Sequence, residues 1–305
     1  MKKIKEFNTP ILLIGFNRPD LIKIVIDQIG KIEPSKLYIA IDGPRNRFDE
    51  EKIDEIKRSI KNIKWKCDLK VKFQKDNLGC KYGPVVAMNW FFEHEEMGII
   101  LEDDVLADKT FFYFAQELLI EYKNDKRVGS ISGNNFQFGH KNSDDSYYFS
   151  RYSHSCGWAT WRRVWEKYDI EINSWSKNSE ILDKVFAGWW ERFYWRLIFN
   201  GIKTGEIDSA WDYQWNLMMW TEGMLGIIPN QNLVNNIGFG RPDATHTKFK
   251  SKFENMLVEP ILFPLKHPLV VSQNIELDAI TQRQNYVLWK ELGVRLIRRL
   301  KLVHR

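Results

Sequence analysis

Three consecutive acidic side chains give this sequence its clearest capacity for chemistry. Glu102, Asp103 and Asp104 follow the apolar run Ile99 to Leu101, and Val105 comes next. Such a run predicts a buried strand with the acids at its exit from the sheet. At about 4 Å and an effective dielectric near 20, each pair of like charges costs roughly 4 kcal/mol, which favours a bound cation. We expect a Mn²⁺ or Mg²⁺ site here, because both ions prefer carboxylate oxygens, with an acidic surface turn as the alternative.

Two further positions offer side chains for catalysis or metal binding. Asp212 lies between Trp211 and Tyr213. Aromatic neighbours would desolvate its carboxylate and raise its pKa, which suits a general base, although Asp212 is equally suited to cap the next helix. His246 lies among small polar residues and would complete a metal shell begun by Asp104; a structural role is the alternative. Because side chains alternate along a strand, Asp104 and Glu102 would lie on one side of it and Asp103 on the other.

Tryptophans concentrate in the second half of the chain. Ten of the thirteen lie between Trp158 and Trp220. Most of these rings are expected in the core, but amphipathic rings also suit a sugar-binding cleft. Trp158 follows Gly157 in an expected loop before a helix, so it is our candidate for contact with a sugar acceptor.

The elements that would position these residues alternate between strand and helix. The expected strands are Pro10 to Phe16, Leu37 to Ile41, Leu69 to Phe73, Gly98 to Leu101 and Val128 to Ser132. The expected helices are Leu21 to Ile29, Asp49 to Ile63, Pro84 to Phe92, Lys109 to Tyr122 and Trp189 to Ile198, with Pro84 in a first turn. This alternation predicts an α/β fold with a largely parallel sheet, helices on both faces and ligands at the carboxyl ends of the strands.

Overall composition limits the possible functions. The chain has 305 residues, 28% charged and 44% hydrophobic, which is typical of a globular protein. A net charge of +5 does not indicate nucleic-acid binding, and three cysteines without a Cys-x-x-Cys pair indicate reduced thiols in a cytoplasmic protein. The apolar run 11–16 is too short for a signal peptide, and no run of 18 apolar residues would span a bilayer. Neither a Gly-rich loop after the first strand nor a Walker-type Gly-Lys-Ser/Thr occurs, which disfavours a dehydrogenase or kinase.

Several of these motifs together resemble a known family. The acidic triplet after its strand, Phe16-Asn17-Arg18, Ile41-Asp42-Gly43 and Trp211-Asp212 are similar to segments of GT-A fold glycosyltransferases. The resemblance is to the N-acetylglucosaminyltransferase I family and to bacterial sugar transferases of that build, and it covers roughly residues 10–247. It implies a Rossmann-like GT-A fold whose Trp-rich half faces the acceptor.

The resemblance also implies roles for individual residues. Asp104 and His246 would bind the metal on a nucleotide-sugar diphosphate, Asp103 the ribose and Glu102 the donor sugar. Asp212 would take the acceptor's proton, with Trp158 beside the acceptor. The remaining implied donor contacts are Phe16, Asn17, Arg18, Asp42 and, at the diphosphate, Lys81, around which the sequence differs from the animal enzyme's pattern.

We divide the chain into a nucleotide-sugar half at 1–133, an acceptor and catalytic half at 134–265 and an extension at 266–305. In the extension, apolar residues at helical spacing alternate with basic ones over the last twenty residues. This pattern is typical either of a helix at an anionic membrane surface or of a helix docked on the core. We therefore expect a cytoplasmic protein, with peripheral contact at the inner face of the membrane as an option.

The favoured function is a metal-dependent, inverting glycosyltransferase. It would move a sugar from a nucleoside-diphosphate donor, a UDP-sugar by preference, to a hydroxyl of a glycan or lipid-linked acceptor in bacterial surface polysaccharide or lipopolysaccharide synthesis. Two alternatives stay open: a sugar-nucleotide nucleotidyltransferase, and a non-catalytic carbohydrate-binding protein that uses the tryptophans alone.

Overall fold

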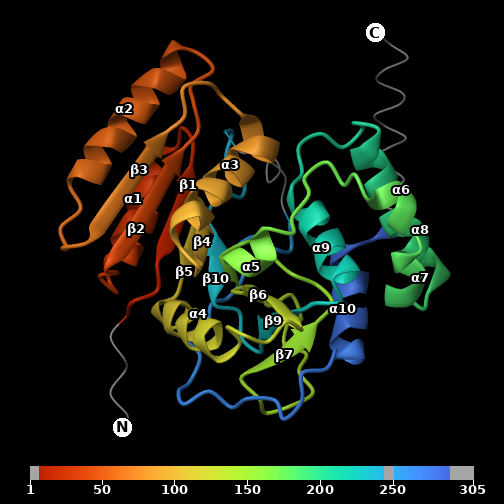
Figure 1. The fold of residues 1–305 in the computed structure, drawn as a ribbon. Coiled ribbons are helices and arrows are strands. Elements are labelled where there is room, and N and C mark those ends of the chain that lie inside the picture. Colours follow the sequence, from red (N-terminus) through yellow and green to blue (C-terminus); the bar gives the residue numbers. More distant parts are fainter. Residues whose placement is uncertain (1–6, 244–250, 289–305) are drawn as a thin grey trace.

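The computed structural model describes residues 7–243 and 251–288 and arranges them around one eight-stranded sheet (Figure 1). Its strands are β1 (Ile11–Gly15), β2 (Lys36–Ile41), β3 (Asp68–Phe73), β4 (Met97–Glu102), β6 (Val128–Ser132), β7 (Tyr147–Ser150), β8 (Trp158–Trp161) and β9 (Leu225–Pro229). They lie in the order β3-β2-β1-β4-β8-β6-β9-β7, and only β8 and β7 run against the others. The predicted α/β class with a largely parallel sheet is confirmed.

Helices cover both faces of this sheet. They are α1 (Pro19–Ile29), α2 (Arg47–Lys61), α3 (Gly79–His94), α4 (Lys109–Glu121), α5 (Arg162–Trp165), α6 (Trp175–Asn178), α7 (Ile181–Val185), α8 (Trp189–Lys203), α9 (Asp212–Thr221) and α10 (Ile275–Asn285). On one face, Gly15 of β1 approaches Ile22 of α1, and on the other, Gly98 of β4 approaches Phe91 of α3. Such close packing on both sides explains why the central strands are continuous apolar runs.

The predicted strands of the first half are confirmed. The central ones are apolar enough to be buried on both faces, whereas β3, at the edge, is exposed or half-buried. All five residues of β1 are buried, as are five of the six in β2. The start predicted for the third helix is wrong: α3 begins at Gly79, so Pro84 lies inside it rather than in its first turn. A proline lacks the N–H that would bond the carbonyl four residues back, but this loss near the helix start is tolerated here.

The sheet continues across the boundary that the sequence suggested at residue 133. Strand β8 is inserted antiparallel between β4 and β6, with Ile100 opposite Trp158. A separate two-stranded sheet pairs β5 (Val105–Ala107) with β10 (Val234–Asn236), so it also joins the two segments. The two halves therefore share their hydrogen-bonded framework, and the functional division between them stays a prediction.

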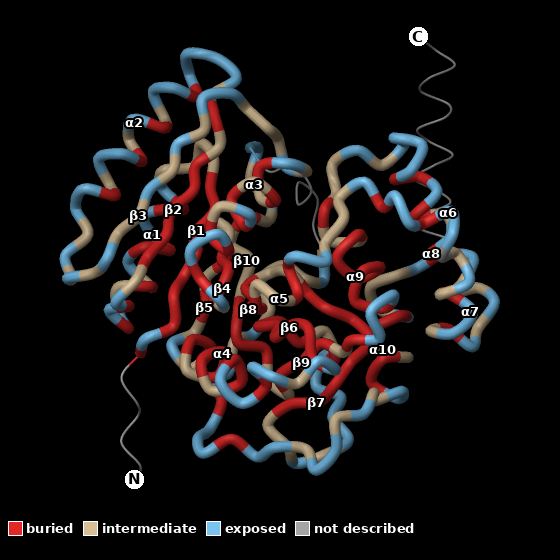
Figure 2. The backbone as a smooth tube through the Cα atoms, viewed as in Figure 1, coloured by how far each residue is buried: buried red, intermediate tan, exposed pale blue. Residues whose placement is uncertain are grey.

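A second hydrophobic core lies beside the sheet, among α6, α7, α8 and α9, where Figure 2 shows buried segments of the tube. Its centre is Trp195, whose ring centroid lies 4.7 Å from those of Trp220 and Tyr286. Eight of the ten clustered tryptophans are buried, so the prediction that most of them belong to the core is confirmed.

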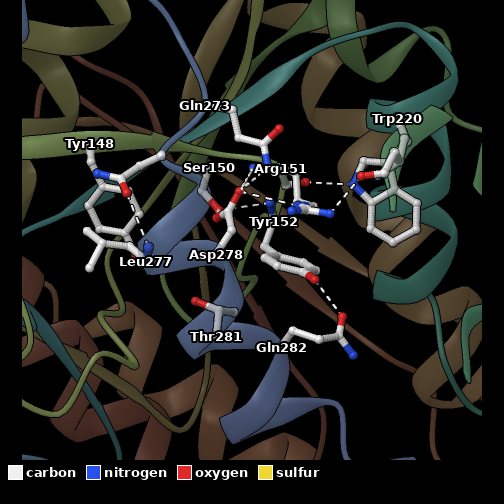
Figure 3. Close-up of polar contacts among 12 residues, drawn as sticks. Tyr148, Ser150, Arg151, Tyr152, Trp220, Gln273, Leu277, Asp278, Thr281 and Gln282 are labelled. Atoms are coloured by element: carbon white, nitrogen blue, oxygen red, sulfur yellow. Dashed lines mark hydrogen bonds and ion pairs between the residues drawn. The ribbon is translucent and has the colours of Figure 1, made fainter. Parts of the chain in front are cut away.

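Helix α10 is held in place by a buried polar network (Figure 3). Asp278 accepts hydrogen bonds from the Ser150 hydroxyl, the Arg151 backbone N–H at 3.0 Å and the Gln273 amide at 2.8 Å. Its partner Arg151 also forms an ion pair with it, and both side chains are buried. One turn further on, Gln282 accepts from the Tyr152 hydroxyl. These bonds tie the end of the described chain to strand β7.

Among the described residues, no helix is both long and apolar enough to cross a bilayer. The basic amphipathic segment expected near the end of the chain lies outside the described residues, which stop at 288.

The Asp278 network yields a prediction about stability. We expect Asp278→Ala to lower the free energy of unfolding by about 3–5 kcal/mol, because it leaves the buried Arg151 guanidinium without its counter-charge. Urea denaturation followed by circular dichroism measures the change. Glu276→Ala, at an exposed position of the same helix, is the matched control and should stay within about 0.5 kcal/mol of the parent. Equal stability of the two variants would contradict the role given to the network.

Candidate active site

The three predicted acids lie together where β4 ends, at the carboxyl edge of the parallel strands. Strand β4 stops at Glu102, and Asp103 and Asp104 form the turn that leads into β5. The expectation that Asp103 and Asp104 lie on opposite sides is wrong, because strand alternation no longer applies in this turn. Their side chains instead reach the same arginine.

That arginine, Arg18, is the local counter-charge of the acidic turn. Its Nε donates to Asp103 Oδ2 at 3.2 Å, its Nη1 donates to Asp104 Oδ2 at 3.1 Å, and its Nη2 donates to Asp103 Oδ1. Arg18 directly precedes α1, whose Pro19 starts the helix with the fixed φ of proline. The sequence predicted that Arg18 lies at the end of a strand. Its pairing with Asp103 and Asp104 is seen only in the structure.

The pKa values of Glu102 and Asp103 at this turn are raised mainly by burial and secondly by the neighbouring negative charges. Desolvation raises the pKa of Glu102 to about 8, and the charges of Asp104 and Asp103 add to the rise. Desolvation likewise raises the pKa of Asp103 to about 6, although the Arg18 charge opposes it. Carboxylates held this way gain from any further positive charge, such as a metal ion or a cationic transition state.

Asp212, the predicted base, lies near these acids. It is the first residue of α9 and is half-buried, and its charge contributes to the raised pKa of Glu102. It also raises the pKa of Tyr168 after the larger effect of burial. The residue at the N-cap position of α9 is Trp211, which forms no side-chain capping bond. The fold therefore brings together two acidic groups that are far apart in the sequence.

Two other predicted residues organise loops. Both oxygens of Asp42 accept from the backbone N–H of Leu78, at 2.9 and 3.1 Å, and Oδ2 accepts from Gly79 N–H at 2.9 Å. Asn17 donates to Asp49 Oδ1 at 2.5 Å. Asp42 thus fixes the start of α3. A contact between Asp42 and a nucleotide stays a prediction.

Phe16 and Lys81, two further predicted donor contacts, interact with different groups. The Phe16 backbone N–H donates to Asp103 Oδ2 at 3.4 Å, and the Arg45 guanidinium lies 4.8 Å from the centroid of its ring. Lys81, on α3, contacts Glu171 at 3.4 Å and lies over the ring of Tyr82. Phe16 is therefore part of the acidic site, whereas Lys81 is directed to a different ion pair.

The loop position predicted for Trp158 is wrong. The residue belongs to strand β8, and its side chain is 1% exposed. Its ring packs against Trp215, with centroids 5.0 Å apart, and against Trp211 at 5.8 Å. A ring buried to this extent has no surface that could contact an acceptor. Its effect on the site is to support Trp211, the residue that precedes Asp212.

The predicted metal ligand His246 lies outside the described residues. Within the part of the chain that the structure describes, no three His, Cys, Asp or Glu side chains form a metal cage. Oxygen donors do gather at Asp104: a Cβ at Gly238 would lie 2.5 Å from Asp104 Oδ2 and 3.1 Å from Asn236 Oδ1. This set fits Mg²⁺ or Mn²⁺, which needs only one or two protein oxygens when a diphosphate supplies others.

Sequence reasoning missed Asn236. Nothing in its neighbourhood marks it, because it approaches Asp104 only through the antiparallel pairing of β10 with β5, which sets Asn236 opposite Val105.

A cavity of about 170 Å³ lies near the acidic turn, at the carboxyl end of β6. Its walls are Asn134, Phe136, Cys156, Val234, Asn235, Asn236, Phe239, Phe253 and Met256. Among the described residues, the buried Oδ1 atoms of Asn134 and Asn235 have no hydrogen-bond partner. The Cys156 thiol lies close enough to Asp104 for that charge to help raise its pKa, after burial. Aromatic walls with unpaired amide oxygens suit an uncharged polar group such as a sugar ring.

Comparisons with known proteins bear on the fold alone. No protein-family model and no curated protein matches the chain. A cytidylyltransferase from Leptospira borgpetersenii serovar Hardjo-bovis aligns at a TM-score of 0.33 and 10% identity, over 65% of this chain and 73% of its own. A UDP-glucose pyrophosphorylase bound to UDP-glucose aligns at 0.34 and 10%, over 52% and 78%. The glycosyltransferase GlyE of Streptococcus pneumoniae TIGR4 aligns at 0.32 and 10%, over 72% of this chain and 45% of its own.

Gly238 provides a test of the oxygen cluster. A methyl group at this position would overlap Asp104 Oδ2, so we expect Gly238→Ala to displace the carboxylate while leaving the fold intact. Divalent-metal binding, measured by calorimetry in the presence of a nucleoside diphosphate, should weaken about tenfold or more, the size of effect seen when groups around a metal are disturbed. An unchanged midpoint of thermal unfolding in Gly238→Ala controls for a general loss of folding. Unchanged metal affinity in Gly238→Ala would remove Asp104 from the metal site.

Proposed function

We propose that this protein is a glycosyltransferase that uses a nucleoside-diphosphate sugar and a divalent cation. The observation that carries the proposal is the packing of Trp158, which lies opposite Ile100 of β4, against Trp211, which directly precedes Asp212 and so brings it toward the acidic end of β4. A pure carbohydrate-binding protein has no need of a second carboxylate beside a metal-binding turn. A transferase needs one group for the departing diphosphate and another for the acceptor proton.

In this proposal Asp104 and Asn236 hold the metal, with His246 as the further ligand that the family resemblance implies. Mn²⁺ or Mg²⁺ would act as a Lewis acid that offsets the charge of the departing diphosphate. Arg18 holds Asp103 and Asp104 in position and offsets their mutual repulsion. Asp103 is then assigned to the ribose, and Phe16, Asn17 and Asp42 line or shape the nucleotide pocket.

Asp212 is the proposed base. The acceptor hydroxyl oxygen attacks the anomeric carbon, and the bond from that carbon to the diphosphate oxygen breaks with its electron pair. The hydroxyl proton passes to Asp212, which contributes about 10²–10⁴-fold in rate. A base on the face opposite the leaving group gives inversion at the anomeric carbon. The half-buried position of Asp212 at the first turn of α9 suits this role.

The cavity beside Asn134 is the proposed place of the donor sugar. It adjoins the acidic turn, where Glu102 would contact the sugar hydroxyls, and a UDP-sugar is the favoured donor. A glycan or lipid-linked acceptor in surface polysaccharide or lipopolysaccharide synthesis would then approach from the Asp212 side.

Substitution of the two key carboxylates tests the mechanism. We expect Asp104→Asn to abolish the metal-linked binding of a nucleoside diphosphate, because the main anionic ligand is lost. Asp212→Asn should bind metal and nucleotide as the parent does but transfer sugar about 10²–10⁴-fold more slowly. Isothermal calorimetry with Mn²⁺ and UDP, together with release of UDP from UDP-sugars, gives both readouts.

Assays with other substrates separate the competing functions. Release of pyrophosphate from a nucleoside triphosphate and a sugar phosphate would indicate a nucleotidyltransferase. Sugar binding without any metal-linked nucleotide binding would indicate a carbohydrate-binding protein. Full transfer activity in Asp212→Asn would rule out Asp212 as the base.

The sugar cavity has its own test. Asn134→Leu keeps a similar side-chain volume but removes the unpaired oxygen, so binding of a UDP-sugar should weaken by about tenfold. Binding of UDP alone should not change, since UDP lacks the group that enters the cavity. Comparison of the two dissociation constants by calorimetry isolates the sugar contribution. A parallel loss for UDP and UDP-sugar would assign the cavity to the nucleotide instead.

A further inference from the structure

Positive charge is concentrated along one edge of the molecule, far from the acidic turn in the sequence. Residues 57–75 contain eight Lys or Arg side chains and a single Asp, so this segment carries +7 while the rest of the chain carries −2. We call these eight side chains the basic edge: Lys57, Arg58, Lys61, Lys64, Lys66, Lys70, Lys72 and Lys75. The chain's net positive charge is therefore a local property.

The basic edge is open to solvent and poorly neutralised. Six of its members are exposed, and Lys70 and Lys72 are half-buried. Among the described residues, only Lys57 has a carboxylate within ion-pair distance, Asp54 at 2.8 Å. Lys70 donates to the Tyr38 hydroxyl rather than to an acid. The five exposed members other than Lys57 are thus available to an external anionic partner.

The position of these residues in the fold puts them on the outermost border of the sheet. Strand β3 is the terminal strand, and α2 with the loop after it leads into β3 (Figure 1). Lysines on an edge strand also prevent pairing with other chains, which explains Lys70 and Lys72. It does not explain Lys61, Lys64, Lys66 and Lys75, which are exposed and lie outside β3.

The shape of the basic edge favours a broad anionic surface over a small ligand. Six residues of β3 extend for roughly 20 Å, at about 3.3 Å each, and charged side chains lie beyond both ends. Neither of the cavities described in this structure is lined by a residue of the edge. Val71 and Phe73, 36% and 38% exposed, alternate along β3 with Lys70 and Lys72 and lie on its other face, where the Lys57 ammonium is 5.4 Å from the centroid of the Phe73 ring. Lysines mixed with apolar side chains suit a lipid headgroup layer.

We propose that the basic edge docks the protein on a membrane surface that carries anionic lipid headgroups. The inference does not depend on the proposed catalytic chemistry, because none of its residues belongs to the acidic site. It also differs from the expectation for the tail, since it rests on residues 57–75 alone.

Vesicle co-sedimentation of the full chain tests the proposal. The parent protein should bind phosphatidylcholine vesicles that contain phosphatidylglycerol, and not vesicles of phosphatidylcholine alone. Neutralisation of four exposed members, as K61Q, K64Q, K66Q and K75Q together, should reduce the partition coefficient at least about tenfold, since each lysine near an anionic surface contributes roughly fivefold.

Two control proteins make the result specific. Four exposed lysines elsewhere, changed as K126Q, K141Q, K177Q and K184Q, remove the same charge and should bind vesicles as the parent does. Arginine at positions 61, 64, 66 and 75 keeps the charge and should restore binding, which separates lost charge from altered folding.

Three outcomes would overturn the proposal. They are equal binding by the basic-edge variant and the parent, equal loss in the two glutamine variants, and parent protein that binds duplex DNA but no anionic vesicle.

Discussion

The architecture of the site depends on the neutralisation of crowded carboxylates by Arg18. Asp103 and Asp104 are both buried, and their repulsion would be prohibitive without a cation between them. Arg18 supplies it from the start of α1, so the contact also joins β4 to the helix that follows β1. Because one guanidinium spans two carboxylates, a change in Arg18 would disturb the acidic turn and the first helix together. A further cation could then interact with Glu102 and with the part of Asp104 that Arg18 does not contact.

Carboxylates at this edge of the sheet divide into two functional groups. Asp42 and Asp49 are used within the protein: Asp42 accepts from the backbone N–H groups of Leu78 and Gly79, and Asp49 accepts from that of Arg45. Asp104 and Asp212 both lie near enough to Glu102 for their charges to raise its pKa, after the larger effect of burial. Acidic residues at strand ends therefore do not all serve a ligand, and the hydrogen-bond partners separate those that position loops from those available for chemistry.

The sequence was sufficient for features that arise from local pattern. Apolar runs such as that of β1 predict central strands, because a strand that is buried on both faces must be apolar along its whole length. Features that depend on long-range pairing could not be predicted. Trp158 was expected in a loop because Gly157 precedes it, yet insertion between β4 and β6 makes it a buried strand residue. Asn236 has no local signal at all, and only the β5–β10 pairing brings it to Asp104.

The relative placement of Glu102 and Asp212 follows from Trp158. In the β4–β8 ladder Trp158 is opposite Ile100, two positions before Glu102. The same indole packs on Trp211, which immediately precedes Asp212, and on Trp215 one turn into α9. One buried side chain therefore connects the strand that ends in the acids to the helix that begins with the proposed base. Interiors are packed too closely for such a ring to move freely, so the separation of the two carboxylates is set by the core rather than by the surface loops.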